Sequence, residues 1–314
     1  MTPRLSVVIP CHNEQDALAP FWQTLAQTLG SLNGLEHEVI FVNDGSTDHT
    51  QVLLETLADT DARIRVIEFS RNFGKEAATT AGLHEATGNV VLTLDADLQH
   101  PPELIPQFID AWRAGADIVV GVRTNNASDS LIKKIGSGLY YRLMGFLSET
   151  VVTPRATDFR LLDRTVVDEF KRLTEHNRMT RGLIDWLGFK RTHVRFTAPE
   201  RMHGEASYST RKLIKLAAES FIAHSLAPLK LAGYLGMFIT LLAAALGFVM
   251  ITDRYFGVWG FAFSGPAILA TFILFLVGIV LIALGLLSFY IGTIYRETQN
   301  RPLYVIRRRH AASS

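Results

Sequence analysis

Short apolar runs rich in β-branched residues alternate with amphipathic stretches over residues 5–121. The apolar runs predict strands, and the amphipathic stretches between them predict helices. The predicted strands are 5–10, 38–43, 63–69, 90–94 and 117–122, and the predicted helices are 16–29, 50–58, 76–86 and 102–114. Regular alternation of the two is typical of an α/β domain with a largely parallel sheet.

The predicted strand at 90–94 ends in a group of oxygen-bearing side chains. Because residues two apart on an extended strand share a face, Asp95 and Asp97 can converge on one ion, and Gln99 adds a third oxygen if the turn bends back. Mg²⁺ or Mn²⁺ would suit this site, since nucleotide sites hold a hard divalent cation with one or two carboxylates plus substrate phosphates. The alternative is a surface turn whose aspartates are solvated or cap the next helix.

Two other predicted strands end in similar polar motifs, PCHNE at 10–14 and NDGSTD at 43–48. In open α/β sheets, ligands bind beyond the carboxyl ends of the strands. A carboxylate such as Glu14 or Asp44 can accept hydrogen bonds from ribose hydroxyls or a base imino group. No GxGxxG or GxxxxGK motif is present, which disfavours dinucleotide and P-loop sites. The alternative for Asp44 is turn and helix-cap chemistry.

The formal net charge of +1 hides a C-terminal region almost without charge. No charged residue occurs between Lys230 and Asp253, or between Arg254 and Arg296. Each interval exceeds the roughly 20 apolar residues that span a bilayer. The pattern predicts two transmembrane helices, 231–251 and 266–291, with a hydrophobic soluble hairpin as the alternative. The preceding stretch, 210–225, predicts an amphipathic helix at the membrane surface or an ordinary connector helix.

Basic residues on both sides of these intervals predict the orientation. They are Arg211, Lys212, Lys215 and Lys230 before the first interval, and Arg296, Arg301, Arg307, Arg308 and Arg309 after the second. Because positive residues stay in the cytoplasm, we expect both termini and the α/β domain on the cytoplasmic side of an inner or plasma membrane. The apolar run at 5–10 is too short for a cleavable signal. The single cysteine, Cys11, permits no internal disulfide and fits a reducing compartment.

Six motifs in order resemble glycosyltransferase family 2, which has the GT-A fold, and more narrowly its polyprenyl-phosphate glycosyltransferases. They are VVIPCHNE, VNDGSTDHT, RNFGKEAA, LDADLQHPPE, TDFRLLDR and RMHGEASYS. With the two predicted spans, the resemblance covers nearly the whole chain. It implies a Rossmann-like GT-A catalytic domain at 1–209, an interfacial helix at 210–225, a two-helix transmembrane domain at 226–295 and a basic tail at 296–314.

The resemblance also implies which residues form the site. The nucleotide sugar is expected to contact Pro10, Glu14, Asp44, Asp95, Ala96, Asp97 and Arg201, and the metal Asp95, Asp97 and Gln99. The acceptor phosphate is expected at Arg123, Lys133, Lys134, Ser137 and Lys212, and the catalytic residues are expected to be Asp95, Asp97, Asp158 and Arg123. Either Lys133 or Lys134 is the closer acceptor contact. The family often has lysine where this chain has Tyr208, and Lys212 is the candidate replacement.

Asp158 and Arg160 lie on one face of an extended segment, TDFRLLDR. By the resemblance, Asp158 orients a sugar hydroxyl or the reacting centre. A structural ion pair between Asp158 and Arg160 is the alternative.

The expected chemistry follows from charge. A divalent cation stabilises the departing nucleoside diphosphate. The acceptor, a lipid phosphate with a second pKa of about 6, is largely dianionic at neutral pH and needs positioning more than a base. The resemblance implies inverting transfer of a hexose to polyprenyl (undecaprenyl) phosphate. UDP-glucose is the first choice of donor, because TDFRLLDR resembles the bactoprenol glucosyltransferase branch, and UDP-GlcNAc, UDP-galactose or GDP-mannose are the alternatives.

Two other functions remain open at this point. One is a processive polysaccharide synthase, which the absence of a QxxRW motif disfavours. The other is a non-catalytic membrane partner that binds nucleotide sugar and regulates another protein, which the intact acidic motif disfavours. Nucleic acid is not expected as a partner, and a homo-oligomer is possible through glycines of the second predicted span.

Overall fold

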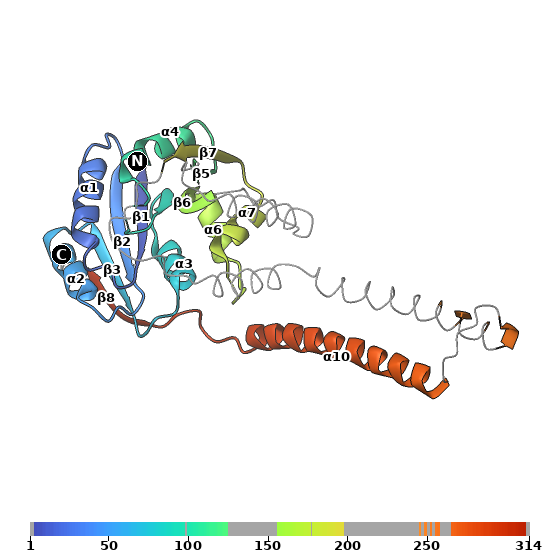
Figure 1. The fold of residues 1–314 in the computed structure, drawn as a ribbon. Coiled ribbons are helices and arrows are strands. Elements are labelled where there is room, and N and C mark those ends of the chain that lie inside the picture. Colours follow the sequence, from blue (N-terminus) through green and yellow to red (C-terminus); the bar gives the residue numbers. More distant parts are fainter. Residues whose placement is uncertain are drawn as a thin grey trace. The chain divides into compact units, whose positions relative to one another are not determined.

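The structure is a computed structural model (Figure 1) that describes residues 3–97, 99–124, 156–176, 178–197 and 265–311, together with 245, 248, 249, 252 and 255–257. The chain divides into two compact units. The first holds the described residues up to 197 and those from 301 onward, and the second holds the others. Each unit is described by itself.

The first unit is built on a sheet with the strand order β7-β5-β6-β4-β1-β2-β3-β8 (Figure 1). The strands are β1 Arg4–Cys11, β2 Glu36–Asn43, β3 Ile64–Phe69, β4 Val90–Thr93, β5 Ile118–Arg123, β6 Ala156–Asp163, β7 Arg191–Phe196 and β8 Ile306–Ala311. The helices are α1 Leu18–Gly30, α2 Thr50–Thr60, α3 Lys75–Glu85, η1 Pro102–Leu104, α4 Ile105–Arg113, α6 Arg164–Lys171 and α7 Thr180–Trp186, and the second unit contains α10 Gly265–Thr298.

The strand pairing places the carboxyl ends of four strands at one edge of the sheet. β1 pairs in parallel with β2 and with β4, and β2 pairs in parallel with β3. The α/β part of the fold prediction is therefore confirmed. The chain leaves β1 toward β2 and later returns to the other side of β1 as β4, so the strand order reverses there. Ligands of such sheets bind at this reversal.

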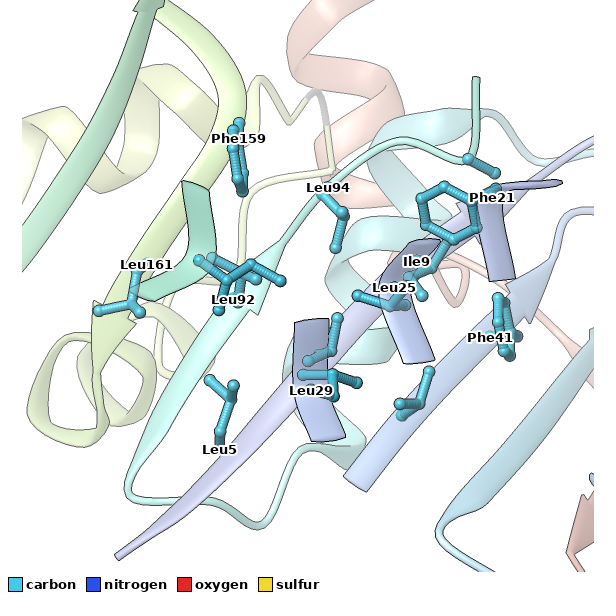
Figure 2. Close-up of a cluster of buried hydrophobic side chains, with 14 of the residues drawn as sticks. Leu5, Ile9, Phe21, Leu25, Leu29, Phe41, Leu92, Leu94, Phe159 and Leu161 are labelled. Carbon is cyan, nitrogen blue, oxygen red and sulfur yellow. The ribbon is translucent and has the colours of Figure 1, made fainter. Parts of the chain in front are cut away.

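Successive side chains of the central strands point to opposite faces of the sheet and form a hydrophobic layer on each face. On one face, Leu5 and Ile9 of β1 pack with Phe21 and Leu25 of α1 and Leu92 of β4, and all are buried (Figure 2). The other face packs against α3, α6 and α7. Burial on both faces explains the nearly continuous apolar runs of β1 and β4.

Contact between α3 and β1 is so close that a helix residue without a side chain is required. A Cβ added to Gly82 would lie 2.1 Å from Cγ1 of Val8. Gly82 therefore sets how near α3 comes to the sheet, and with it the height at which the first residue of α3, Lys75, stands above the strand ends.

The prediction of two transmembrane helices is wrong for the residues that the structure describes. No helix formed by those residues is both long enough and apolar enough to cross a membrane. The predicted first span, 231–251, lies outside them except at 245, 248 and 249, and the predicted surface helix, 210–225, lies outside them entirely. The prediction was drawn from the absence of charge, and uncharged sequence does not by itself make a spanning helix. The predicted membrane location depended on these two spans, and for the described residues it is wrong on the same ground.

The described end of the predicted basic tail forms strand β8, antiparallel to β3 at the sheet edge. Its arginines face acidic side chains of the first unit: Arg307 lies 3.1 Å from Glu68, Arg308 3.3 Å from Glu55 and Arg309 2.9 Å from Glu85, measured between the nitrogen and oxygen atoms. Backbone pairing and these ion pairs explain a strand that has little apolar character of its own.

Candidate active site

The antiparallel pairing of β4 with β6 brings two distant aspartates together. Thr93 at the end of β4 pairs with Arg160 of β6. Continuing this register by two residues sets Asp95 beside Asp158. The hydroxyl of Thr93 donates to the backbone carbonyl of Asp158 at 2.7 Å, which holds the two segments together beyond the last ladder pair.

Lys75 joins these two carboxylates. Its Nζ lies 2.6 Å from Oδ1 of Asp95 and 2.8 Å from Oδ2 of Asp158. On the other side, Nε of Arg181 lies 3.0 Å from Oδ1 of Asp158. Burial opposes ionisation of Asp158, but Lys75 and Arg181 outweigh it and hold the pKa of this carboxyl below its ordinary value. Burial also works against the charge of Lys75, yet Asp95 and Asp158 raise its pKa above the ordinary value.

The turn after β4 is fixed by a buried histidine. The backbone N–H of Asp95 donates to Nδ1 of His100 at 3.1 Å, so this nitrogen is unprotonated and the neutral ring carries its proton on Nε2. Burial lowers the pKa of His100, which favours the same neutral form. The ring stacks on Phe159 with centroids 5.4 Å apart. His100 therefore shapes the turn without adding positive charge beside Asp95.

Asp97 and Gln99 lie on the same turn. The backbone N–H of Gln99 donates to Oδ1 of Asp97 at 3.1 Å. The buried Gln99 side chain accepts a hydrogen bond from Nη2 of Arg123, at the end of β5, at 2.5 Å. Nε2 of Gln99 and Nε of Arg123 are buried and have no hydrogen-bond partner in the part of the chain that the structure describes. The pair thus leaves buried donors near the acidic turn.

Negative charge accumulates between the ends of β1 and β4. The pKa of Glu14 is raised to about 7, first by burial and then by the charges of Asp97, Asp95 and Asp48. Within the described ranges, no cluster of three or more His, Cys, Asp or Glu side chains could hold a metal by itself. Asp95 and Asp97 alone fit Mg²⁺ or Mn²⁺ that completes its shell with phosphate oxygens and water. The raised pKa of Glu14 also fits a cation at this place, because a nearby positive charge would favour the ionised carboxylate.

Asp44 holds the loop that precedes α3. It is 3% exposed, and its carboxylate accepts hydrogen bonds from the backbone N–H groups of Phe73 at 2.7 Å and Gly74 at 2.9 Å. Burial raises the pKa of Asp44 despite these two donors. Gly74 has φ +100°, a conformation that glycine adopts without strain. Asp44 therefore sets the backbone that places Lys75.

The predicted site residues fall into two groups. Those at the strand ends, Glu14, Asp44, Asp95, Ala96, Asp97 and Gln99, lie on neighbouring loops as expected, with Pro10 on β1 and Asp158 and Arg123 on the adjoining strands. Lys133, Lys134, Ser137, Arg201 and Lys212 lie outside the described residues. The alternative ion pair of Asp158 with Arg160 is not formed, because the buried Arg160 pairs with Asp185 at 2.8 Å.

Sequence reasoning missed Lys75, Arg181 and His100. The motif RNFGKEAA contains Lys75 and contributes to the family resemblance, but the role of Lys75 depends on partners 20 and 83 residues away in the sequence. Only the pairing of β4 with β6 reveals it.

Comparisons with known proteins identify the family of this chain. The family model of Glycosyl transferase family 2 matches residues 6–170. An uncharacterized glycosyltransferase of Synechocystis is 39% identical over 306 residues, which cover 98% of this chain and 95% of that protein. The bactoprenol glucosyl transferase of Shigella phage SfII is 37% identical over 307 residues, which cover 98% of each chain.

Among solved structures, the chain is similar to glucosyl-3-phosphoglycerate synthase from Mycobacterium tuberculosis in complex with Mn²⁺ and uridine-diphosphate-glucose. The TM-score is 0.46 at 17% identity, with 70% of this chain and 77% of that chain covered. The family model over residues 6–170 and the two relatives over nearly full length confirm the family resemblance of the six motifs. The chain belongs to glycosyltransferase family 2 and is a glycosyltransferase.

Proposed function

We propose that this glycosyltransferase moves glucose from UDP-glucose to polyprenyl phosphate, with inversion at the anomeric carbon. The observation that carries the proposal is the acidic edge formed by Asp95, Asp97 and Asp158 in a chain that is 37% identical, over 98% of its length, to a bactoprenol glucosyl transferase. That relative's name supports the choice of sugar and lipid class, and the clustered carboxylates support the proposed position of the reacting centre.

The donor would lie across the ends of β1, β2 and β4. Asp95 and Asp97 would hold Mg²⁺ or Mn²⁺, which when bound stabilises negative charge on the departing diphosphate. Pro10, Glu14, Ala96 and Asp44 would line the nucleoside end, and Asp44 would do so chiefly through the loop that it fixes at Phe73 and Gly74.

Asp158 is suited to orient the sugar rather than to remove a proton. Lys75 and Arg181 keep its pKa below the ordinary value, so it is a weak base at neutral pH. An ionised carboxylate beside the sugar can accept a hydroxyl hydrogen bond and can stabilise positive charge that develops at the anomeric carbon. The acceptor needs no base, because a phosphate monoester is largely dianionic at neutral pH.

The acceptor phosphate would bind near Arg123. The buried donors of Arg123 and Gln99 that lack partners among the described residues suit an anion. Lys133, Lys134, Ser137 and Lys212 are proposed to complete this site. A phosphate oxygen then forms a bond to the anomeric carbon while the bond from that carbon to UDP breaks on the opposite side, and this single displacement inverts the configuration.

The test uses the purified full-length chain, undecaprenyl phosphate in detergent, Mg²⁺, and radiolabelled UDP-glucose, UDP-GlcNAc, UDP-galactose or GDP-mannose in parallel. We expect one glucose on the lipid, with the β configuration by proton NMR. Asp97→Asn should abolish transfer, whereas Asp110→Asn on α4, away from the strand ends, should not. Failure to form a lipid-linked product from any donor would refute the proposal, a different preferred donor would refute the sugar, and a polymer would favour the synthase.

A further inference from the structure

The backbone on both sides of Lys75 is held in place by hydrogen bonds. It is the first residue of α3, and the preceding Gly74 is tied by its backbone N–H to Asp44 at 2.9 Å. The next residue, Glu76, accepts a hydrogen bond from the backbone N–H of Thr180, at the start of α7, at 2.7 Å. The start of α3 is thus anchored on two sides, and the ammonium group is directed to the acidic turn.

The ammonium group of Lys75 contacts both oxygens of Asp95, the carboxylate that a metal ion would need as a ligand. Lys75 lies 2.6 Å from one oxygen of Asp95 and donates to the other at 2.8 Å. Among the residues that the structure describes, the other basic group near Asp95 is His100, which is neutral because its Nδ1 accepts the Asp95 N–H. Within that part of the chain, Lys75 is therefore the positive charge that balances Asp95. A divalent cation bound to Asp95 would lie next to the Lys75 ammonium group, and the two positive charges would repel each other.

The side chain has room to move. Its exposed fraction is 45%, against 22% for Asp95 and 26% for Asp158. A lysine ammonium is a compact charge on a flexible stem with three rotatable donors, so it can exchange one anionic partner for another without rebuilding its surroundings. The diphosphate of a donor, which arrives with the cation, is such a partner.

We propose that Lys75 is the resident counter-ion of Asp95, that it competes with the divalent cation for this carboxylate, and that the donor diphosphate relieves the competition by accepting Lys75. The inference rests on the proposed function, in which cation and donor share this site. It makes cation binding weak in the free protein and strong when nucleotide is present, so the enzyme takes up the two together. Binding energies that depend on each other in this way are reciprocal.

The test measures Mn²⁺ binding to the full chain by electron paramagnetic resonance of the free ion, with and without UDP. For Lys75→Met without UDP, we expect Mn²⁺ affinity to rise about tenfold or more above that of the wild type, and the gain on adding UDP to shrink correspondingly. Lys75→Arg keeps the charge and should retain weak binding. Circular dichroism and thermal melts establish that each variant is folded.

Arg181→Met is the matched control. It removes one positive charge from the same cluster, but Arg181 pairs with Asp158 and not with Asp95. We expect it to change Mn²⁺ affinity less than about threefold, because its effect acts only at a distance. Asp97→Asn should weaken binding in every background, which establishes that the measured ion is at the proposed place.

The outcomes separate this inference from the proposed function. Unchanged or weaker Mn²⁺ binding by Lys75→Met, or equal gains for Lys75→Met and Arg181→Met, would overturn the competition while leaving the transferase proposal intact. No Mn²⁺ binding by the wild type even with UDP would overturn the cation site itself, and the competition with it. The transfer assay, run on the same preparations, reports the proposed function independently.

Discussion

A buried ion pair beneath the candidate site makes a quantitative prediction about stability. Arg160 of β6 is 2% exposed at its side chain and lies 2.8 Å from Asp185 of α7, itself 8% exposed. Arg191 approaches the same Asp185 oxygen at 3.3 Å from a side chain that is 24% exposed. Asp185→Ala would leave the Arg160 charge buried without a counter-ion.

Removing one partner of a buried pair costs about 3 to 5 kcal/mol. Because Asp185→Ala also takes the carboxylate partner from the buried Nη1 of Arg191, we expect a loss of at least about 3 kcal/mol, which corresponds to a fall in Tm of roughly 6 to 12 °C or more for a domain of this size. Urea unfolding at neutral pH measures the difference. Glu169→Gln breaks an exposed pair with Arg172 and should cost less than about 0.5 kcal/mol.

A second variant isolates the cause. Replacing both partners by apolar residues, Arg160→Met with Asp185→Leu, removes the stranded charge and should recover most of the lost stability. A loss below about 1 kcal/mol for Asp185→Ala, or a double variant no more stable than the single one, would refute the reasoning and assign the position of α7 to packing alone. Because α7 also carries Arg181, activity should fall with the single variant.

Three further predictions concern the site and its support. Gly82→Ala should destabilise the protein by about 1 to 3 kcal/mol in urea unfolding, since its Cβ would meet Val8, and Val8→Ala should partly rescue it. The pKa of Glu14 is raised in the folded protein, so the folded state binds the carboxyl proton more tightly than the unfolded state does, and this contribution to stability is lost as pH rises from about 4.5 to 7. Glu14→Gln should therefore be more stable than the wild type above pH 7, and parallel pH profiles of unfolding free energy for the two proteins would contradict this. Asp158→Asn should lower kcat by about 100-fold or more with little change in donor KM, and a change confined to KM would argue for a binding role instead.

The sequence predicted the elements that periodicity controls. The strands at 5–10 and 90–94 correspond to β1 and β4, because a run buried on both faces has an unmistakable apolar pattern. The meeting of Asp95 and Asp97 with Glu14 followed from the rule that parallel strands end at one edge. That much of the site depends on local sequence and on a general property of sheets.

Other features depend on pairings that no local pattern encodes. Lys75 reaches Asp158 only because β6 runs antiparallel beside β4. Alternation correctly put Asp158 and Arg160 on one face, but their partners come from α3 and α7. Strand β8 lies in the predicted basic tail. Its arginines adopt a strand conformation because they pair with the edge of β3, and no local pattern predicts that pairing.

The protein is proposed to transfer glucose to a lipid phosphate at the site formed by Asp95, Asp97 and Asp158. A comparison of the wild type with a variant of this site tests that proposal most directly. Wild-type protein and Asp97→Asn are incubated with UDP-glucose, Mg²⁺ and undecaprenyl phosphate, and the lipid fraction is analysed by mass spectrometry. We predict a mass increase of a single hexose on the lipid with the wild type and none with the variant. Equal product from both proteins, or no product from the wild type, would contradict the claim.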